Sequence, residues 1–311
     1  MKRQSRLKHS RLSSIVFFVC VSVILLTRGA LAAEYQVSTL AELTNKIASA
    51  DYGDTIKVAS GTYSPTETLT ITKRITLSGG WNSNFTTQTG TSILDGGGNV
   101  QILKISASAD VDGFTFQNAN NTNGDGGGIS IGTSSNFAVN ISNCTFTGNT
   151  AKSGGAMGID APTTITNCIF TGNKAASNYG GAIYSGHYGK LTITDCTFTE
   201  NSSQNSGGGI YMNGEPESKI SNCVITKNTS GNYGGGFATG AYYGSSSASV
   251  TFESCDITNN MSTGSGAGLY LGGGTSTFIS CDISGNVISG DNSGAGVYSI
   301  HAATKFINCN V

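Results

Sequence analysis

Seven cysteines recur through the chain at spacings of 24 to 32 residues, and their thiols are the first groups that could do chemistry: Cys144, Cys168, Cys196, Cys223, Cys255, Cys281 and Cys309. Structural zinc sites usually need cysteines two to four residues apart, and no two of these stand so close. An oxidising compartment favours disulfides, but seven is odd, and equivalent positions of stacked parallel strands lie side by side rather than facing. We interpret these cysteines as buried thiols that pack as small hydrophobic groups.

Carboxylates and histidines are the next candidates. Hydrolysis of a glycosidic bond needs two or three carboxylates on one face, and elimination needs a base such as Arg or Lys, often with a Ca²⁺ site. Asp256 and Asp282 each follow a cysteine and could bind a cation if they stack, although a solvated face is the favoured interpretation. His187 and His301 are interpreted as surface residues. No arginine follows Arg74, so we predict no catalytic residue, no metal site and no cofactor.

Tyrosines recur at one position, directly after the apolar residue that follows a glycine pair: Tyr184, Tyr211, Tyr270 and Tyr298. Other repeats hold Ser130, Gly158 and Ala238 there. A residue next to an inward-facing strand residue faces outward, so these tyrosines should line one side of the fold. Exposed aromatic rows bind sugar rings by stacking, and cross-strand tyrosines also stabilise a sheet by packing alone. The four tyrosines are our candidate carbohydrate-binding residues.

A repeat of about 27 residues must position all of these groups. An apolar residue stands three before each cysteine and another stands two after it, as in Ile141 and Phe146 around Cys144. An asparagine stands five after six of the cysteines: Asn149, Asn173, Asn201, Asn228, Asn260 and Asn286. Length varies only between these motifs, as it does in loops that protrude from stacked units.

Three short strands per repeat, without a helical period, predict one coil of a parallel β-helix. A β-sandwich is the rival architecture, but it does not need one register across seven units. In a solenoid the apolar residues and the cysteine face inward, and the asparagines form a hydrogen-bonded ladder at a corner. The glycines serve positive φ or close backbone approach. The predicted fold class is therefore all-β, a right-handed parallel β-helix with an N-terminal capping helix; its handedness rests on unit length and on the resemblance described below.

Residues 1–33 combine a basic leader, an apolar run and a small-residue cleavage site, which predicts a secretory signal peptide. This segment holds six of the 17 Lys and Arg residues and none of the 18 Asp and Glu residues, so residues 34–311 carry 11 − 18 = −7 formal charges. Such a surface makes nucleic acid a poor partner. No apolar run after Leu26 is long enough to span a membrane as a helix.

The rest of the chain divides into two parts. Residues 34–112 are predicted to form an N-terminal cap and the first irregular coils, with a capping box at Thr39-Leu40-Ala41-Glu42 that opens a helix to about Ala50. Residues 113–311 are the regular repeats. The chain stops in mid-motif at Val311, so we expect that the natural protein continues, with a C-terminal anchor domain missing here, or that this is a fragment.

The pairing of Phe146-Thr147-Gly148-Asn149 with Gly154-Gly155-Ala156-Met157, and its recurrence along the chain, resembles the repeats of polymorphic outer membrane proteins. The resemblance covers about residues 113–311, and the segment around Gly53 to Tyr63 resembles the first coil of pectin-lyase-like proteins. The repeats of polymorphic outer membrane proteins form right-handed β-helical passenger domains on bacterial surfaces, and several of these proteins are implicated in adhesion. The family's C-terminal β-barrel is not in this sequence, and isoleucine replaces the phenylalanine in the later repeats, as at Ile225.

These observations predict a bacterial protein that is secreted or displayed on the outer-membrane surface, with an adhesin-like or structural role and no catalysis of its own. The expected partners are surface glycans or a host or neighbouring cell. Two alternatives stay open, namely a polysaccharide lyase or glycoside hydrolase of the pectin-lyase-like fold, and a noncatalytic carbohydrate-binding surface.

Overall fold

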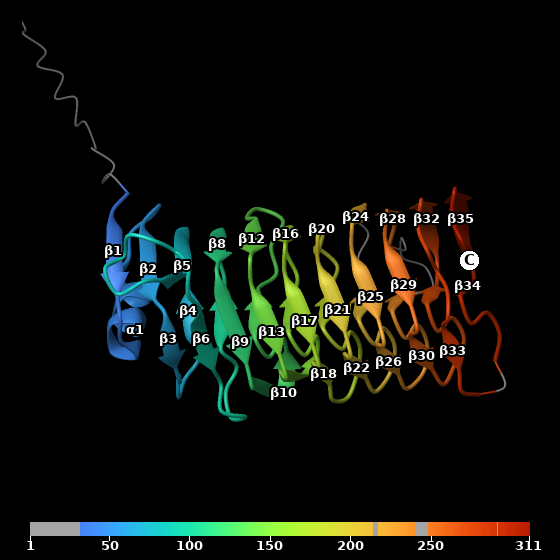
Figure 1. Ribbon diagram of the computed structural model, residues 1–311, viewed down its shortest axis with the longest axis horizontal. Coiled ribbons are helices and arrows are strands. Elements are labelled where there is room, and N and C mark those ends of the chain that lie inside the picture. The colour runs from blue at the N-terminus through green and yellow to red at the C-terminus, as the bar shows by residue number, and fades with distance from the viewer. Residues whose placement is uncertain (1–31, 214–216, 241–247, 291) are drawn as a thin grey trace, which may run out of the picture. The chain divides into compact units, whose positions relative to one another are not determined.

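The computed structural model describes residues 32–213, 217–240, 248–290 and 292–311. Up to residue 31, the predicted signal peptide lies outside the described residues. Within residues 32–311 the chain winds through four parallel sheets, and successive coils follow one another in chain order from the helix α1 to the strand β35 (Figure 1). The predicted all-β parallel β-helix is confirmed.

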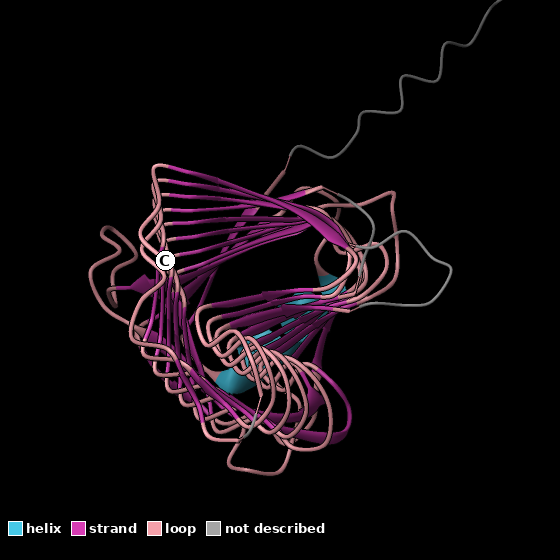
Figure 2. Ribbon diagram, turned by 90° about the vertical axis from the view of Figure 1, so that its right-hand side faces the viewer, coloured by secondary structure: helices cyan, strands magenta, loops and turns pink. Residues whose placement is uncertain are grey.

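Between Ala109 and Leu271 each coil passes through the four sheets in the same order, and Figure 2 shows the strands superposed along the stack. Among the described residues, the earlier coils have no strand in the seven-stranded sheet, and the last coil has none in the eight-stranded sheet. Sheet 1 has 11 strands: β1 (Glu34–Val37), β2 (Thr55–Ala59), β5 (Ile75–Trp81), β8 (Ala109–Asp112), β12 (Val139–Ser142), β16 (Thr163–Thr166), β20 (Leu191–Thr194), β24 (Ser218–Ser221), β28 (Val250–Glu253), β32 (Gly274–Ile279) and β35 (Ala302–Ile307). Sheet 2 has eight: β3 (Gly61–Tyr63), β6 (Ser92–Asp95), β9 (Phe114–Gln117), β13 (Thr145–Thr147), β17 (Ile169–Thr171), β21 (Thr197–Thr199), β25 (Val224–Thr226) and β29 (Asp256–Thr258).

The remaining two sheets complete the coil. Sheet 3 has seven strands: β10 (Asn120–Asp125), β14 (Thr150–Ser153), β18 (Lys174–Ala175), β22 (Ser202–Ser203), β26 (Thr229–Ser230), β30 (Met261–Ser262) and β33 (Val287–Ile288). Sheet 4 has nine: β4 (Leu69–Ile71), β7 (Leu103–Ile105), β11 (Ile129–Ile131), β15 (Met157–Ile159), β19 (Ile183–Ser185), β23 (Ile210–Met212), β27 (Phe237–Thr239), β31 (Leu269–Leu271) and β34 (Val297–Ser299).

The interior is built from ladders of like side chains, as the repeat predicts. Phe116, Phe146, Phe170 and Phe198 are fully buried, and their rings stack with centroids 5.0, 4.8 and 4.6 Å apart. The residue before each cysteine bends the chain between sheets 1 and 2 with positive φ, for example 51° at Asn143. Polar residues occupy this corner because short side chains with hydrogen-bonding groups tolerate the left-handed conformation best.

The predicted asparagine ladder is confirmed between sheets 2 and 3. Nδ2 of each asparagine donates to Oδ1 of the asparagine one coil further on, at distances of 2.9 to 3.1 Å, from Asn149 through to Asn286. Five of the six asparagines, Asn149 to Asn260, are fully buried. Each buried amide finds its partners inside the stack, so the ladder replaces the water that these groups lose on folding.

The glycine pair serves the two purposes expected of it. Gly180 has φ 68°, a conformation that side chains disfavour. Gly181 has no such φ, but a Cβ at this position would lie 2.0 Å from the carbonyl oxygen of Gly208 in the next coil. The pair therefore allows the chain to turn from sheet 3 to sheet 4 while coils stay at strand spacing.

The N-terminal coil is covered by α1 (Leu40–Ser49), which begins with the predicted capping box: Glu42 N donates to Thr39 Oγ1 at 3.2 Å, and Thr39 N donates to Glu42 Oε2 at 3.1 Å. Leu43 and Ile47 are buried and belong to the core. Among the described residues, no helix is long and apolar enough to cross a membrane.

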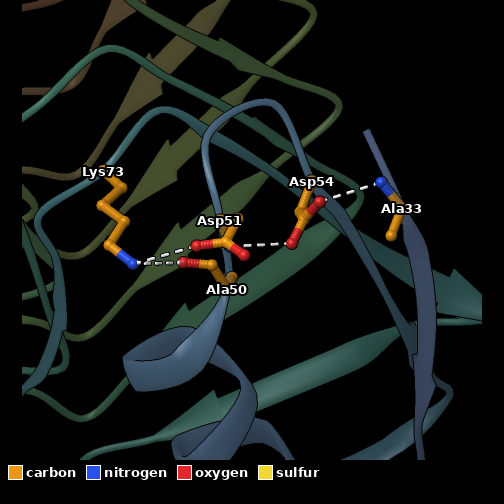
Figure 3. A network of polar contacts seen from close by, with 5 residues as sticks. All are labelled: Ala33, Ala50, Asp51, Asp54 and Lys73. Atoms are coloured by element: carbon orange, nitrogen blue, oxygen red, sulfur yellow. Dashed lines mark hydrogen bonds and ion pairs between the residues drawn. The ribbon is translucent and has the colours of Figure 1, made fainter. Parts of the chain in front are cut away.

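Asp54 joins this helix to the first strands (Figure 3). Its carboxylate accepts hydrogen bonds from the backbone N–H groups of Ala33, at 2.8 Å, and Asp51, at 2.7 Å. Lys73 Nζ reaches the carbonyl oxygen of Ala50 at 2.9 Å and the Asp51 carboxylate at 3.4 Å. The residues that follow α1 are therefore tied to both β1 and the turn before β5.

We expect this junction to weaken in acid. The hydrogen bonds from Ala33 and Asp51 lower the pKa of Asp54 below its ordinary value of 3.8. A depressed pKa stabilises the fold above the ordinary value, and that contribution is lost as pH falls through 3.8 towards the lower folded value. Thermal unfolding followed by circular dichroism should show that acidification lowers the unfolding temperature of Asp54→Ala by less than that of the wild type. An equal drop in both proteins would contradict this role of Asp54.

Candidate functional site

A groove of about 570 Å³ lies on the outer face of sheet 4. Its floor is the row of outward positions that also holds the tyrosines, because Lys104, Ser130, Gly158 and Tyr184 are register partners on β7, β11, β15 and β19. Small residues at Ser130 and Gly158, between a lysine and a tyrosine, leave this part of the row hollow. The groove therefore exists because two neighbouring coils lack the large side chain found further along.

Two carboxylates line the groove. Asp125 comes from the end of β10 and Asp160 from the residue after β15. Asp160 accepts hydrogen bonds from Thr133 Oγ1 at 2.5 Å and from the backbone N–H of Tyr188 at 3.3 Å. These two contacts bring together segments of three successive coils on one side of the groove.

Glycines give both carboxylates their room. A Cβ at Gly158 would lie 2.8 Å from Cβ of Asp125, and a Cβ at Gly186 would lie 2.6 Å from Oδ1 of Asp160. Neither of these glycines has a positive φ, so the close approach of the Asp125 and Asp160 side chains, rather than backbone conformation, accounts for glycine at these positions. The positions of the carboxylates and the glycines beside them are coupled.

Tyr184 closes one end of the groove and is half-buried. Burial raises the pKa of its phenol, and the negative charges of Asp125 and Asp160 raise it further. The phenol therefore keeps its proton at neutral pH and can donate a hydrogen bond to a ligand in the groove. An uncharged phenol, two carboxylates and an ammonium group thus line one groove.

The four predicted tyrosines do lie in one outward row, but they pack on one another more than the sequence suggested. Tyr184, Tyr270 and Tyr298 are half-buried, whereas Tyr211 is only 8% exposed. Tyr179 stacks on Tyr211 with ring centroids 4.3 Å apart. Burial raises the pKa of the Tyr211 phenol beyond its ordinary range. Tyr211 therefore has a packing role, and the other three offer more surface to a ligand.

A second tyrosine cluster continues the row beyond the groove. Tyr233 stacks on Tyr270 at 4.5 Å between centroids, and Tyr270 lies 5.7 Å from Tyr298. Sequence reasoning missed Tyr179 and Tyr233, although both stand directly before a glycine pair, in the stretch Asn-Tyr-Gly-Gly. That repeated stretch is the signal that could have found them.

The structure also places the predicted aspartates and histidines. Asp256 and Asp282 do stack on adjacent coils, and Asp282 accepts a hydrogen bond from Asn310 Nδ2 at 2.9 Å. No cluster of three or more potential metal ligands occurs among the described residues. His301 is exposed with φ 57°, whereas His187, also exposed, lines the groove. The interpretation of His187 as a surface residue therefore omits its place beside Asp160.

The seven cysteines are unpaired, and six of them are buried. The hydrogen bond with Cys168, the preceding cysteine of the ladder, raises the pKa of Cys196, and burial raises it further, to about 12. Cys144 N donates to Cys168 Sγ at 3.4 Å, in the side-by-side arrangement expected of parallel strands. The thiolate is the reactive form, so the raised pKa of Cys168, Cys196, Cys223, Cys255 and Cys281 makes these five thiols poorly reactive. Six of the seven cysteines are buried as the sequence predicted, whereas Cys309 is only partly buried.

The fold and the groove define a class of protein, a parallel β-helix with a polar groove on one outer face. Residues 104–311 match the family model described as "Right handed beta helix region", and the chain belongs to that family. A search of curated proteins found no significant match. One similar solved structure is a mannuronic acid specific polysaccharide family 6 lyase from human gut microbiota, with 12% identity over 88% of this chain and 87% of that one and a TM-score of 0.37. At that level, the match says nothing about activity.

Proposed function

We propose that this protein is a secreted or cell-surface β-helical passenger that binds a carbohydrate in the groove on sheet 4 and has no catalysis of its own. The observation that carries the proposal is the groove itself, in which Lys104, Asp125, Asp160 and Tyr184 surround the small residues Ser130 and Gly158. Sugar-binding sites combine an aromatic face with a few well-placed polar groups. A structural passenger would need no such hollow in its tyrosine row.

The finer features of the proposal rest on the sequence. The resemblance to polymorphic outer membrane proteins, together with the basic and apolar leader in residues 1–33, supports a bacterial, adhesin-like protein at the outer-membrane surface or outside the cell. Its partner would then be a surface glycan of a host or neighbouring cell. The net charge of −7 in residues 34–311 argues against nucleic acid.

The decisive variant fills the groove with a residue that the row already accepts elsewhere. Ser130→Tyr places an outward tyrosine beside Gly158, in register with the tyrosines of later coils. We expect glycan-array binding to fall by at least about tenfold, equivalent to about 1.4 kcal/mol, while the unfolding temperature stays unchanged. The matched control is Ser202→Tyr, because Ser202 is an outward residue on β22 of sheet 3. This variant should bind as the wild type does.

Tyr184→Ala should also lower affinity, by about tenfold, because it removes the aromatic end of the groove. A glycan that binds Ser130→Tyr as tightly as the wild type would show that this groove is not the binding site. Shortened or unsaturated oligosaccharides after long incubation with the wild type would instead favour the lyase or hydrolase alternative. The carboxylates Asp125 and Asp160 would then be the first residues to test.

A further inference from the structure

The charges around the groove restrict the kind of carbohydrate that it can hold. Of the residues that line it, Lys104 carries a positive charge, and Asp125 and Asp160 carry negative charges. With histidine neutral, the formal sum is 1 − 2 = −1. Among the described strands of sheet 4, Lys104 is the only charged residue.

An acidic polysaccharide carries a carboxylate on each uronate unit and needs a cation for each one that it buries. Lys104 could meet one such group at one end of the groove. The next units would lie against Asp125 and Asp160, and like charges placed together cost several kcal/mol on the general scale of such interactions. The surrounding surface, with −7 formal charges in residues 34–311, would add long-range repulsion.

A neutral sugar chain meets none of these costs. Its hydroxyl groups can donate to the Asp125 and Asp160 carboxylates in charge-assisted hydrogen bonds, and Lys104 can donate to a hydroxyl or ring oxygen. Beyond Tyr184 and the buried Tyr211, the outward row continues with Ala238 and then with the uncharged, half-buried Tyr270 and Tyr298. Their rings and phenols suit the apolar faces and hydroxyl edges of uncharged pyranose units.

We infer that the ligand of this groove is an uncharged polysaccharide, held by hydrogen bonds from its hydroxyl groups to Asp125 and Asp160, and not a uronate polymer. This inference rests on the proposed function and names its ligand class. It also assigns roles to three residues that sequence reasoning did not single out, with the carboxylates as acceptors for sugar hydroxyls and Lys104 as a donor.

The experiment is affinity electrophoresis of the purified protein in gels that contain one polysaccharide each. Mannan, xylan and dextran represent neutral chains, and alginate and polygalacturonate represent acidic ones. We expect retardation by at least one neutral chain, little changed between ionic strengths of about 0.05 and 0.5 M because no net charge is neutralised. Ser130→Tyr should abolish the retardation, which assigns it to the groove.

The double variant Asp125→Asn/Asp160→Asn tests the inferred contacts. It should lose at least about tenfold in affinity for the neutral chain and should gain retardation by alginate or polygalacturonate, because the groove then has one positive charge. Lys174→Gln on β18 is an exposed control that should change neither property. Unfolding temperatures of all variants separate lost binding from lost folding.

Two outcomes would overturn the inference in different ways. If the wild type binds alginate or polygalacturonate, Ser130→Tyr removes that binding and Lys104→Gln weakens it, the proposed glycan-binding function stands and the ligand class is wrong. If none of the five polysaccharides retards the protein and a broad glycan array is also negative, the proposed function fails and the inference falls with it.

Discussion

Replacing Asn201 with aspartate is expected to lower the free energy of unfolding by about 3 to 5 kcal/mol. Asn201 is fully buried, and its Nδ2 donates to Phe170 O at 3.0 Å and to Asn228 Oδ1 at 2.9 Å. Its Oδ1 accepts from both N and Nδ2 of Asn173. An aspartate has the same shape but would point an oxygen at two acceptors and bring a buried charge into the ladder.

Urea unfolding followed by circular dichroism measures this effect. The matched control is Asn259→Asp, because Asn259 is exposed, in the left-handed conformation that aspartate tolerates, and adjacent to the ladder residue Asn260. We expect the control to change the free energy of unfolding by less than about 0.5 kcal/mol. Similar midpoints for Asn201→Asp and Asn259→Asp would show that the ladder contributes little to stability.

The second large effect is expected from Phe170→Ala, which should lower the free energy of unfolding by about 3 to 5 kcal/mol. Phe170 is fully buried in the middle of the phenylalanine ladder, with Phe146 at 4.8 Å and Phe198 at 4.6 Å between ring centroids. Truncation leaves a ring-sized hole in the interior and removes both stacking contacts. Coils stabilise their neighbours in a solenoid, so we expect the loss to extend beyond one repeat.

The chain itself supplies the control for this variant. Ile225, Ile257 and Ile283 hold the equivalent position in later coils and are buried there. Phe170→Ile should therefore cost clearly less than Phe170→Ala, because isoleucine refills much of the hole. Equal destabilisation by the two substitutions would mean that ring stacking, rather than filled volume, determines the stability of this ladder.

These two ladders also bear on the proposed function. They fix the spacing and register of the coils, and the groove needs both, since Lys104, Ser130, Gly158 and Tyr184 come from four successive coils. Variants that loosen the ladders are therefore unsuitable for testing the site. Ser130→Tyr and Asp125→Asn/Asp160→Asn change side chains on the outside of the stack and leave the ladders intact.

The repeat allowed much of the interior to be predicted from the sequence. One register across seven cysteines places each residue type on its counterpart one coil away, so the buried cysteines, the phenylalanines around Phe146 and the asparagine ladder all followed from spacing. The capping box at Thr39 and Glu42 is likewise local, because the two residues lie in one helical turn. Local and periodic patterns determine structure wherever each coil repeats the previous one.

The groove was decided by the tertiary structure because it arises where the coils differ. Asp125 ends β10 on sheet 3 and Asp160 follows β15 on sheet 4, at different positions of their repeats, so no periodicity relates them. They line one groove because parallel coils stack and because Gly158 and Gly186 leave room for their carboxylates. The burial of Tyr211 depends on Tyr179, which reaches it from a loop of another coil. The sequence by itself therefore determined the regular core of this protein, and tertiary packing determined which irregular residues share its outer surface.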